Sequence, residues 1–265
     1  MRVAPLERLR AAFGGGQSLA RLVRDLRALG LDPGDDVLVH ASLSRIGYVP
    51  GGARTVVRAL LAAVEPGGTV LFPAHTGGPR VGPDNPPAFD VRNSPTVRIG
   101  IIPETARRQP GALRSLHPTH SVSALGPRAA FFVEGHERCA TPCGAGSPYD
   151  KLRAHGGKIL LLGCGHAANT TLHLVEELAE VPYHMLPGEG IARMVDADGR
   201  ELELPFRFHS WKARRNFMRP DPELTRLGIQ RVGCVGLAES RLLDAGALCD
   251  FVFSRLRDDP DYLRA

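Results

Sequence analysis

The chain has 265 residues, of which 43% are hydrophobic and 23% are charged, and its formal net charge is +5 at pH 7. This composition is ordinary for a globular protein with a large core and excludes a low-complexity chain. The basic residues are almost all arginines, but they are scattered, so the charge does not indicate a nucleic-acid partner.

The first part of the chain alternates helical and strand patterns. Apolar residues at helical spacing predict a helix over residues 18–29, which Ser18 can cap and Gly30 can end. The pattern then predicts a short buried strand at 37–40, a small-residue loop at 41–47, a helix at 55–64 and a strand at 69–72. Segment 74–98 is rich in glycine and proline. A connection this long usually carries a function, so we expect a lid or binding loop there.

The second part continues the alternation and adds a hairpin. It predicts a short helix at 101–108, strands at 121–125 and 158–162, and a helix from about Thr170 to Glu180. Segments 191–195 and 201–208 flank the turn 196–199, which is a hairpin signal. The tail, 236–257, reads as a pair of amphipathic helices.

These elements indicate an α/β fold with a mixed central sheet flanked by helices and with an antiparallel hairpin part. Residues 1–265 show no internal repeat and no clear linker, so we predict a single domain. We expect residues 1–17 to form a loosely ordered N-terminal extension.

The cysteines and the apolar runs indicate the compartment. Five cysteines show no zinc-type pairing, which favours a reduced, cytoplasmic protein. No apolar run reaches the roughly 18 residues that a membrane span needs, and the N-terminus lacks the apolar core of a secretory signal. We therefore expect neither a membrane nor a nucleic-acid partner.

A histidine and a glutamate on the predicted helix 170–180 form a candidate catalytic pair. His173 and Glu176 are three residues apart and therefore share one helix face. Glu176 can fix the tautomer of His173 and leave its other ring nitrogen free to act as a general base. Thr170 or Thr171 could cap this helix, and free amides there could stabilise an oxyanion. The alternative is an ordinary surface pair.

Three other motifs each allow a functional and a structural interpretation. Residues 163–168 match the dinucleotide fingerprint G-x-G-x-x-A, which keeps an NAD-binding oxidoreductase as an alternative function, although no acid follows about 20 residues on. His117 and His120 could ligate zinc but lack an evident third ligand, so loop histidines with satisfied hydrogen bonds are favoured. Cys164 could be a nucleophile, but packing beneath a turn is favoured. We expect no metal.

Several motifs together resemble one enzyme family. They read VHASLSRIG at 39–47 with Gly51 and Gly52, RSLHPTHS at 114–121, GSPYDKL at 146–152, LLGCGH at 161–166 and NTTLHLVE at 169–176. In order and spacing they resemble the aminoglycoside 3-N-acetyltransferase family, which has the antibiotic acetyltransferase fold. The resemblance runs from about residue 20 to 255, and the tail GCVGLAESRLLDA at 233–245 fits the family's ending.

The resemblance implies direct transfer of an acetyl group from acetyl-CoA, the co-substrate, to an amine, without an acyl-enzyme. It implies that His173 is the base, that Glu176 orients it and that Thr171 lies beside the thioester. The residues that it places around the coenzyme are His40, Ser42, Leu43, Ser44, Arg45, Gly47, Ser115, His117 and Ser121. A small-residue loop suits the approach of backbone amides to phosphate, and Arg45 supplies charge.

The acceptor follows from the same resemblance. An aminoglycoside is polycationic, so acids should line the mouth of its site, and the candidates are Asp84, Asp90, Glu177 and Glu180. Arg80, in the loop after the second predicted strand, is unfavourable for such a cation. The same fold acylating a different amine in a biosynthetic pathway therefore stays an alternative. We expect small-molecule partners only and keep a homodimer open as the assembly.

Overall fold

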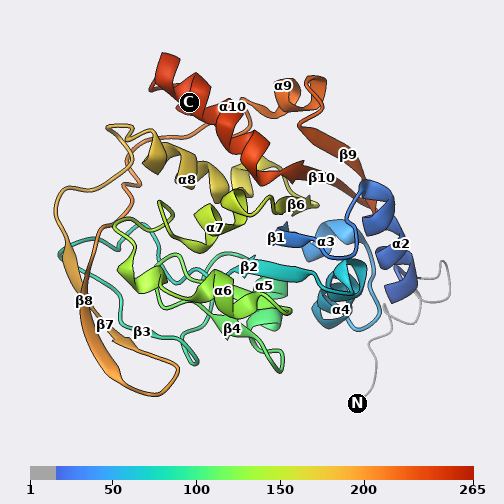
Figure 1. Cartoon of the computed structure of the whole chain (residues 1–265), viewed down its shortest axis with the longest axis horizontal. Coiled ribbons are helices and arrows are strands. Elements are labelled where there is room, and N and C mark those ends of the chain that lie inside the picture. Colours follow the sequence, from blue (N-terminus) through green and yellow to red (C-terminus); the bar gives the residue numbers. More distant parts are fainter. Residues whose placement is uncertain (1–15) are drawn as a thin grey trace.

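The computed structural model describes residues 16–265 and is built around a seven-stranded mixed sheet with helices on both faces (Figure 1). The order of its strands is β4-β5-β2-β1-β6-β10-β9. Strand β1 pairs in parallel with β2 and β6, whereas β5, β4, β10 and β9 add antiparallel pairs at the two edges. A second sheet, β3-β7-β8, lies on the far side of the molecule from helices α2 and α4 (Figure 1).

The bounds of the elements are as follows. The strands are β1 (Asp36–Ala41), β2 (Thr69–Pro73), β3 (Phe89–Asp90), β4 (Leu113–Arg114), β5 (Val122–Leu125), β6 (Lys158–Leu162), β7 (Gly190–Val195), β8 (Glu201–Phe206), β9 (Gln230–Val235) and β10 (Ala238–Asp244). The helices are α2 (Leu19–Leu29), α3 (Leu43–Ile46), α4 (Ala53–Val64), α5 (Ile101–Arg107), α6 (Ala129–Val133), α7 (Pro148–Ala154), α8 (Thr171–Leu178), α9 (Asp221–Arg226) and α10 (Ala245–Asp258), with short 3-10 turns η1 (His136–Arg138) and η2 (His166–Ala168).

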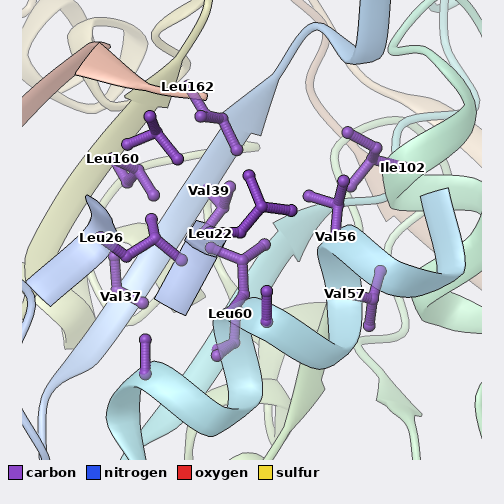
Figure 2. Close-up of a cluster of buried hydrophobic side chains, with 14 of the residues drawn as sticks. Leu22, Leu26, Val37, Val39, Val56, Val57, Leu60, Ile102, Leu160 and Leu162 are labelled. Atoms are coloured by element: carbon purple, nitrogen blue, oxygen red, sulfur yellow. The ribbon is translucent and has the colours of Figure 1, made fainter. Parts of the chain in front are cut away.

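Alternation along the central strands divides the core into two layers. Val37 and Val39 of β1 lie in a cluster with α2 and α4, whereas Leu38 between them lies in a cluster on the opposite face. Successive side chains of a strand point to opposite faces, and both faces are buried, so the strand reads as a continuous apolar run. Figure 2 shows the first cluster, in which side chains of α2 and α4 meet those of β1 and β6.

The second layer holds the helix that carries the candidate catalytic pair. Leu172, Leu174 and Val175 of α8 are fully buried, in one cluster with residues of α7, α10 and the sheet. Helix α8 is therefore fixed against the sheet by its own apolar residues. Among the described residues, no helix combines the length and the apolar character that a membrane-spanning segment requires.

The mixed α/β architecture and several predicted elements are confirmed. Helix α2 begins after Ser18, whose hydroxyl accepts from the Arg21 amide, and ends at Gly30, whose φ of 110° suits a residue without a Cβ. The strands predicted at 37–40, 69–72 and 158–162 are β1, β2 and β6. The predicted hairpin is the antiparallel pair β7–β8.

Other expectations were wrong. The tail 236–257 is not a helix pair, because β10 occupies its first part and pairs with β6 and β9. The loop 41–47 contains the short helix α3. Segment 74–98 contributes the two-residue strand β3, which pairs with β7, and this strand does not contradict the expectation of a binding loop there. The strand β9 and the helices α6, α7 and α9 were not predicted at all.

The N-terminal expectation can be followed only in part. Most of the predicted loose extension, residues 1–17, lies outside the described residues. Gln17 is described, and it is buried with its amide donating to the Tyr48 carbonyl at 2.7 Å. Gln17 is therefore held in the fold and is not part of a loose extension.

Candidate active site

A cavity of about 1030 Å³ opens where the parallel strands end. His40 at the end of β1, His75 after β2 and Cys164 after β6 all line it. In open α/β sheets, ligands bind at the carboxyl ends of parallel strands, where neighbouring connections diverge. The other walls come from segments 97–103, 119–120, 167–173 and 208–217. This volume lies at the upper end of the range typical of small-molecule sites.

Helix α8 brings His173 to the cavity. The helix starts at Thr171, whose amide donates to the Asn169 side-chain oxygen at 3.1 Å. The threonine caps expected from the sequence are not observed, since Asn169 takes that part and Thr170 makes no capping hydrogen bond with its side chain. The side chain of His173 is 23% exposed and lines the cavity, whereas its helix neighbours Leu172 and Leu174 are buried.

The predicted His173–Glu176 pairing is confirmed in geometry. His173 Nδ1 lies 2.8 Å from Glu176 Oε2, and the Glu176 side chain is fully buried. A carboxylate accepts hydrogen bonds only, so His173 donates from Nδ1 and leaves Nε2 as a free acceptor. This is the tautomer that a general base requires.

Arg215 and His184 hold the buried carboxylate of Glu176. Arg215 Nε donates to its two oxygens at 2.9 and 3.0 Å, and His184 Nδ1 lies 3.0 Å from Oε2. Burial by itself raises the pKa of Glu176, but the hydrogen bonds from His173 and His184 outweigh it and hold that pKa well below its usual range. Glu176 is therefore ionised throughout the working pH range.

Burial keeps the imidazoles around the cavity neutral. It lowers the pKa of His173, and the hydrogen bond and charge of Glu176 oppose this effect only in part. Burial also lowers the pKa of His75 to about 3 and that of His120 and His209 well below the usual value. His173 is consequently unprotonated at neutral pH and can accept a proton.

The rings of these histidines form a contiguous group. The His209 ring centroid lies 4.3 Å from that of His120, 4.9 Å from that of His173 and 4.1 Å from that of His184. His184 differs from the others, because its contacts with Glu176 and Glu177 outweigh burial and raise its pKa.

The two histidines of the H-x-x-H motif do not act together. His117 stacks on His136, with ring centroids 4.5 Å apart, and is buried away from the cavity. His120 instead has a ligand atom within 4.8 Å of Cys143 and of His209, and a second such group is His173, His184 and His209. Within residues 16–265, these are the side chains whose spacing could hold a metal, although the carboxylates of Glu176 and Glu177 already bond to His173 and His209.

The glycine-rich turn after β6 favours the structural interpretation over dinucleotide binding. Gly163 has φ of 69°, and a Cβ there would come within 2.8 Å of the Arg45 Cβ, so the turn needs glycine for its shape. Helix α8 begins only at Thr171, so the fingerprint does not open directly into a helix. Burial raises the pKa of Cys164 to about 11, which leaves it a thiol and disfavours it as a nucleophile.

The structure brings part of the expected coenzyme set to the cavity. His40, Ser42, Leu43 and Ser44 line it. Arg45 is exposed on α3 next to these residues but outside the cavity wall. Gly47 is not in the wall either, and it lies against the Leu237 side chain, which a Cβ at this position would meet at 2.9 Å.

Ser115, His117 and Ser121 are corrections to that set. None of them lines the cavity, and all three are buried. The Ser115 hydroxyl lies 2.8 Å from His136 Nδ1, and that of Ser121 donates to the Ala74 carbonyl at 2.6 Å. The hydroxyl groups of Ser115 and Ser121 therefore bond inside the protein, whereas Thr119 and His120 of the same motif line the cavity.

The other expected positions also lie outside the wall. Thr171 is fully buried and does not line the cavity, whereas its neighbour Thr170 does. The Glu177 side chain is 1% exposed and accepts hydrogen bonds from the Cys143 amide and His209. The remaining expected acids are not in the wall: Asp84 and Glu180 are exposed, and Asp90 accepts from amides of its own turn.

Sequence reasoning missed much of what surrounds His173. His184, His209 and Arg215 hold the two buried glutamates. His184 follows the end of α8 by only six residues, whereas His209 and Arg215 are more than 30 residues from the glutamates that they contact. Trp211, Phe217 and Arg98 complete the walls. No spacing pattern connects these residues to α8, so only the folded chain reveals them.

Comparisons with known proteins agree with this geometry. A family model described as aminoglycoside 3-N-acetyltransferase matches residues 38–257. The chain is 35% identical over 261 residues to aminoglycoside N(3)-acetyltransferase VII of Streptomyces paromomycinus, covering 89% of this chain and 90% of the relative.

Solved structures give the same result. The aminoglycoside acetyltransferase AAC(3)-Xa superposes with a TM-score of 0.83 and 34% identity, covering 97% of each chain. AAC-IIIb, solved as a binary complex with CoASH, superposes with a TM-score of 0.79 and 33% identity, covering 91% of this chain and 96% of the other.

Proposed function

The chain belongs to the aminoglycoside 3-N-acetyltransferase family, and we propose that it transfers the acetyl group of acetyl-CoA to an amine of an aminoglycoside. One observation carries the proposal: a neutral His173 lines the cavity with Nε2 free, while a buried carboxylate holds its Nδ1. The names of the relatives and the coenzyme complex of AAC-IIIb support the identity of the two substrates.

The reaction needs one proton acceptor. The unprotonated acceptor amine attacks the thioester carbonyl carbon, the C–N bond forms, and the amine proton passes to His173 Nε2. The C–S bond then breaks and CoA leaves as the thiolate, which takes the proton back from the His173 imidazolium, so that the products are the amide, CoASH and neutral His173. The imidazolium formed on His173 is stabilised by Glu176, whose charge Arg215 and His184 hold in place.

The walls of the cavity suggest where acetyl-CoA lies. Ser42 and Ser44, whose hydroxyl oxygens are 3.3 Å apart, line the cavity after β1 together with Cys164 and Thr170. Small side chains of this kind leave room for a narrow pantetheine arm. Arg45 is exposed beside them, where a phosphate of the coenzyme can reach it. The acetyl group would then meet the amine near His173.

The test is the substitution His173→Ala, with the exposed His155→Ala as its matched control. Thiol release from acetyl-CoA in the presence of an aminoglycoside should fall by roughly 10²–10⁴ in His173→Ala. Calorimetry should show that this variant still binds acetyl-CoA, whereas His155→Ala should behave as the wild type. Near wild-type turnover of His173→Ala at saturating amine would rule out His173 as the base.

The small-molecule partners follow from this function, and assembly as a homodimer stays a prediction. Size-exclusion chromatography with light scattering would decide it.

A further inference from the structure

The described wall of the cavity contains no aspartate and no glutamate. Its only formally charged side chains are Arg98 and Arg215. Arg215 is engaged by Glu176, which lies behind the wall, so that pair contributes little net charge. Arg98 is exposed and makes no ion pair among the described residues, so its charge acts on whatever enters.

The acids nearest to His173 are held in the protein. Glu176 is fully buried beneath His173, and the side chain of Glu177 is 1% exposed beneath His209. Neither presents an oxygen to the cavity, since neither lines it. An ammonium group entering the cavity therefore finds no carboxylate partner.

The groups that the wall does offer suit a sugar or cyclitol ring that carries few ammonium groups. Neutral His120 and His209 flank His173, and the Phe217 ring lies 5.0 Å from that of His173. Trp211 lines the cavity with 55% of its surface exposed, which leaves apolar area for a ligand to cover. An aromatic face attracts one ammonium by roughly 0.5–1 kcal/mol, far less than a set of carboxylates gives a polycation.

On the basis of the proposed function, we infer that this site selects aminoglycosides and related aminocyclitols that carry few ammonium groups. It disfavours the most highly charged members of this class. Recognition rests on ring contacts with Trp211 and Phe217 and on the single reacting amine near His173. Each further ammonium group brought into the cavity loses hydration without gaining a carboxylate and is repelled by Arg98.

Salt dependence distinguishes this site from one lined with acids. Paromomycin and neomycin are a matched pair of probes, since they differ by a hydroxyl in place of one amine. Each is titrated calorimetrically into the CoA-saturated protein at low and at moderate ionic strength. Paromomycin should bind more tightly at low salt, and added salt should strengthen neomycin binding, because it screens repulsion.

A carboxylate placed in the wall should reverse the preference. Val97 lines the cavity and is 38% exposed, so it can be replaced without disturbing the core. Val97→Asp should strengthen neomycin binding at low salt by about fivefold, the effect of one ion pair in water, and binding should then weaken as salt is added. Val97→Asn, which has the same shape without the charge, should show neither effect.

The outcomes separate the inference from the proposed function. Neomycin binding that is tighter than paromomycin binding and weakens with salt in the wild type would overturn the inference even if thiol release is normal. Binding of neither compound would also overturn it. Thiol release no greater than that of His173→Ala would refute the proposed function, while the salt dependence of binding would still decide the inference.

Discussion

Acid should unfold this protein at a higher pH than carboxylate titration alone would predict, because several histidines are buried in the neutral form. Burial lowers the pKa of His40 and His75 to about 3 and that of His136 to about 4, from an ordinary value of 6.5. At a pH between the folded pKa values and the ordinary value, these histidines bind protons in the unfolded chain but not in the folded chain. Stability is therefore complete above pH ~6.5 and is lost as the pH falls toward the folded pKa values.

The size of the effect follows from the number of protons. At pH ~5 the three histidines together bind nearly three more protons in the unfolded chain, so the free energy of unfolding changes by about 4 kcal/mol per pH unit. Between pH ~7 and ~5 the loss is about 6 kcal/mol, a large part of the roughly 5–15 kcal/mol typical of a domain. His184, whose pKa is raised, acts in the opposite direction but offsets at most about one proton.

Urea unfolding followed by circular dichroism at pH 7, 6 and 5 and constant ionic strength measures this slope. His136→Asn removes one buried imidazole and should flatten the slope near pH 5 by about 1.3 kcal/mol per pH unit. His155→Asn, the same substitution at an exposed position, is the matched control. A free energy of unfolding that changes by less than about 1 kcal/mol from pH 7 to 5 would refute the reasoning.

Two further substitutions test the catalytic pair and the coenzyme contact. Glu176→Gln removes the charge that raises the pKa of His173, so the acidic limb of kcat/KM should move to lower pH and the rate should fall by roughly 10²-fold or less; an unmoved limb would argue against the pair. Arg45→Ala should raise the KM for acetyl-CoA several-fold with kcat nearly unchanged, and the loss should shrink at high salt. A fall in kcat at constant KM would instead place Arg45 in the chemistry.

The elements that the sequence predicts are those whose pattern is decided locally. The strands β1, β2 and β6 are central and buried on both faces, so each reads as an uninterrupted apolar run between turn residues. Strand β10 is different, because polar and charged residues, Glu239 and Arg241 among them, interrupt its apolar positions. Its extended conformation comes from pairing with β6 and β9, which no local pattern reveals.

The site divides in the same way. His173 and Glu176 are predictable because one helical turn brings them together. The acids expected to bind the acceptor could not be predicted in the same way, because the expected charge of a ligand does not determine where the side chains of a protein point. Glu177 follows Glu176 on the same helix, yet its side chain turns toward Cys143 and His209 instead of the cavity.

Arg215 is the clearest case of a partner that sequence reasoning could not find, and it gives the sharpest test of the buried network. It is 39 residues from Glu176, with a side chain 13% exposed against a carboxylate that is fully buried. Removing one partner of a buried ion pair leaves an uncompensated charge and typically costs about 3–5 kcal/mol. Arg215→Met should lose stability on that scale in urea unfolding at pH 8.

The matched control is Arg193→Met, since the Arg193–Glu203 pair is equally short at 3.0 Å but its side chains are 83% and 63% exposed. That substitution should cost no more than about 1 kcal/mol. The positive charge of Arg215 also lowers the pKa of His173, so Arg215→Met should move the acidic limb of kcat/KM to higher pH, opposite to Glu176→Gln. Equal stability of the two arginine variants, with an unmoved limb, would show that Arg215 does not hold the carboxylate that orients the base.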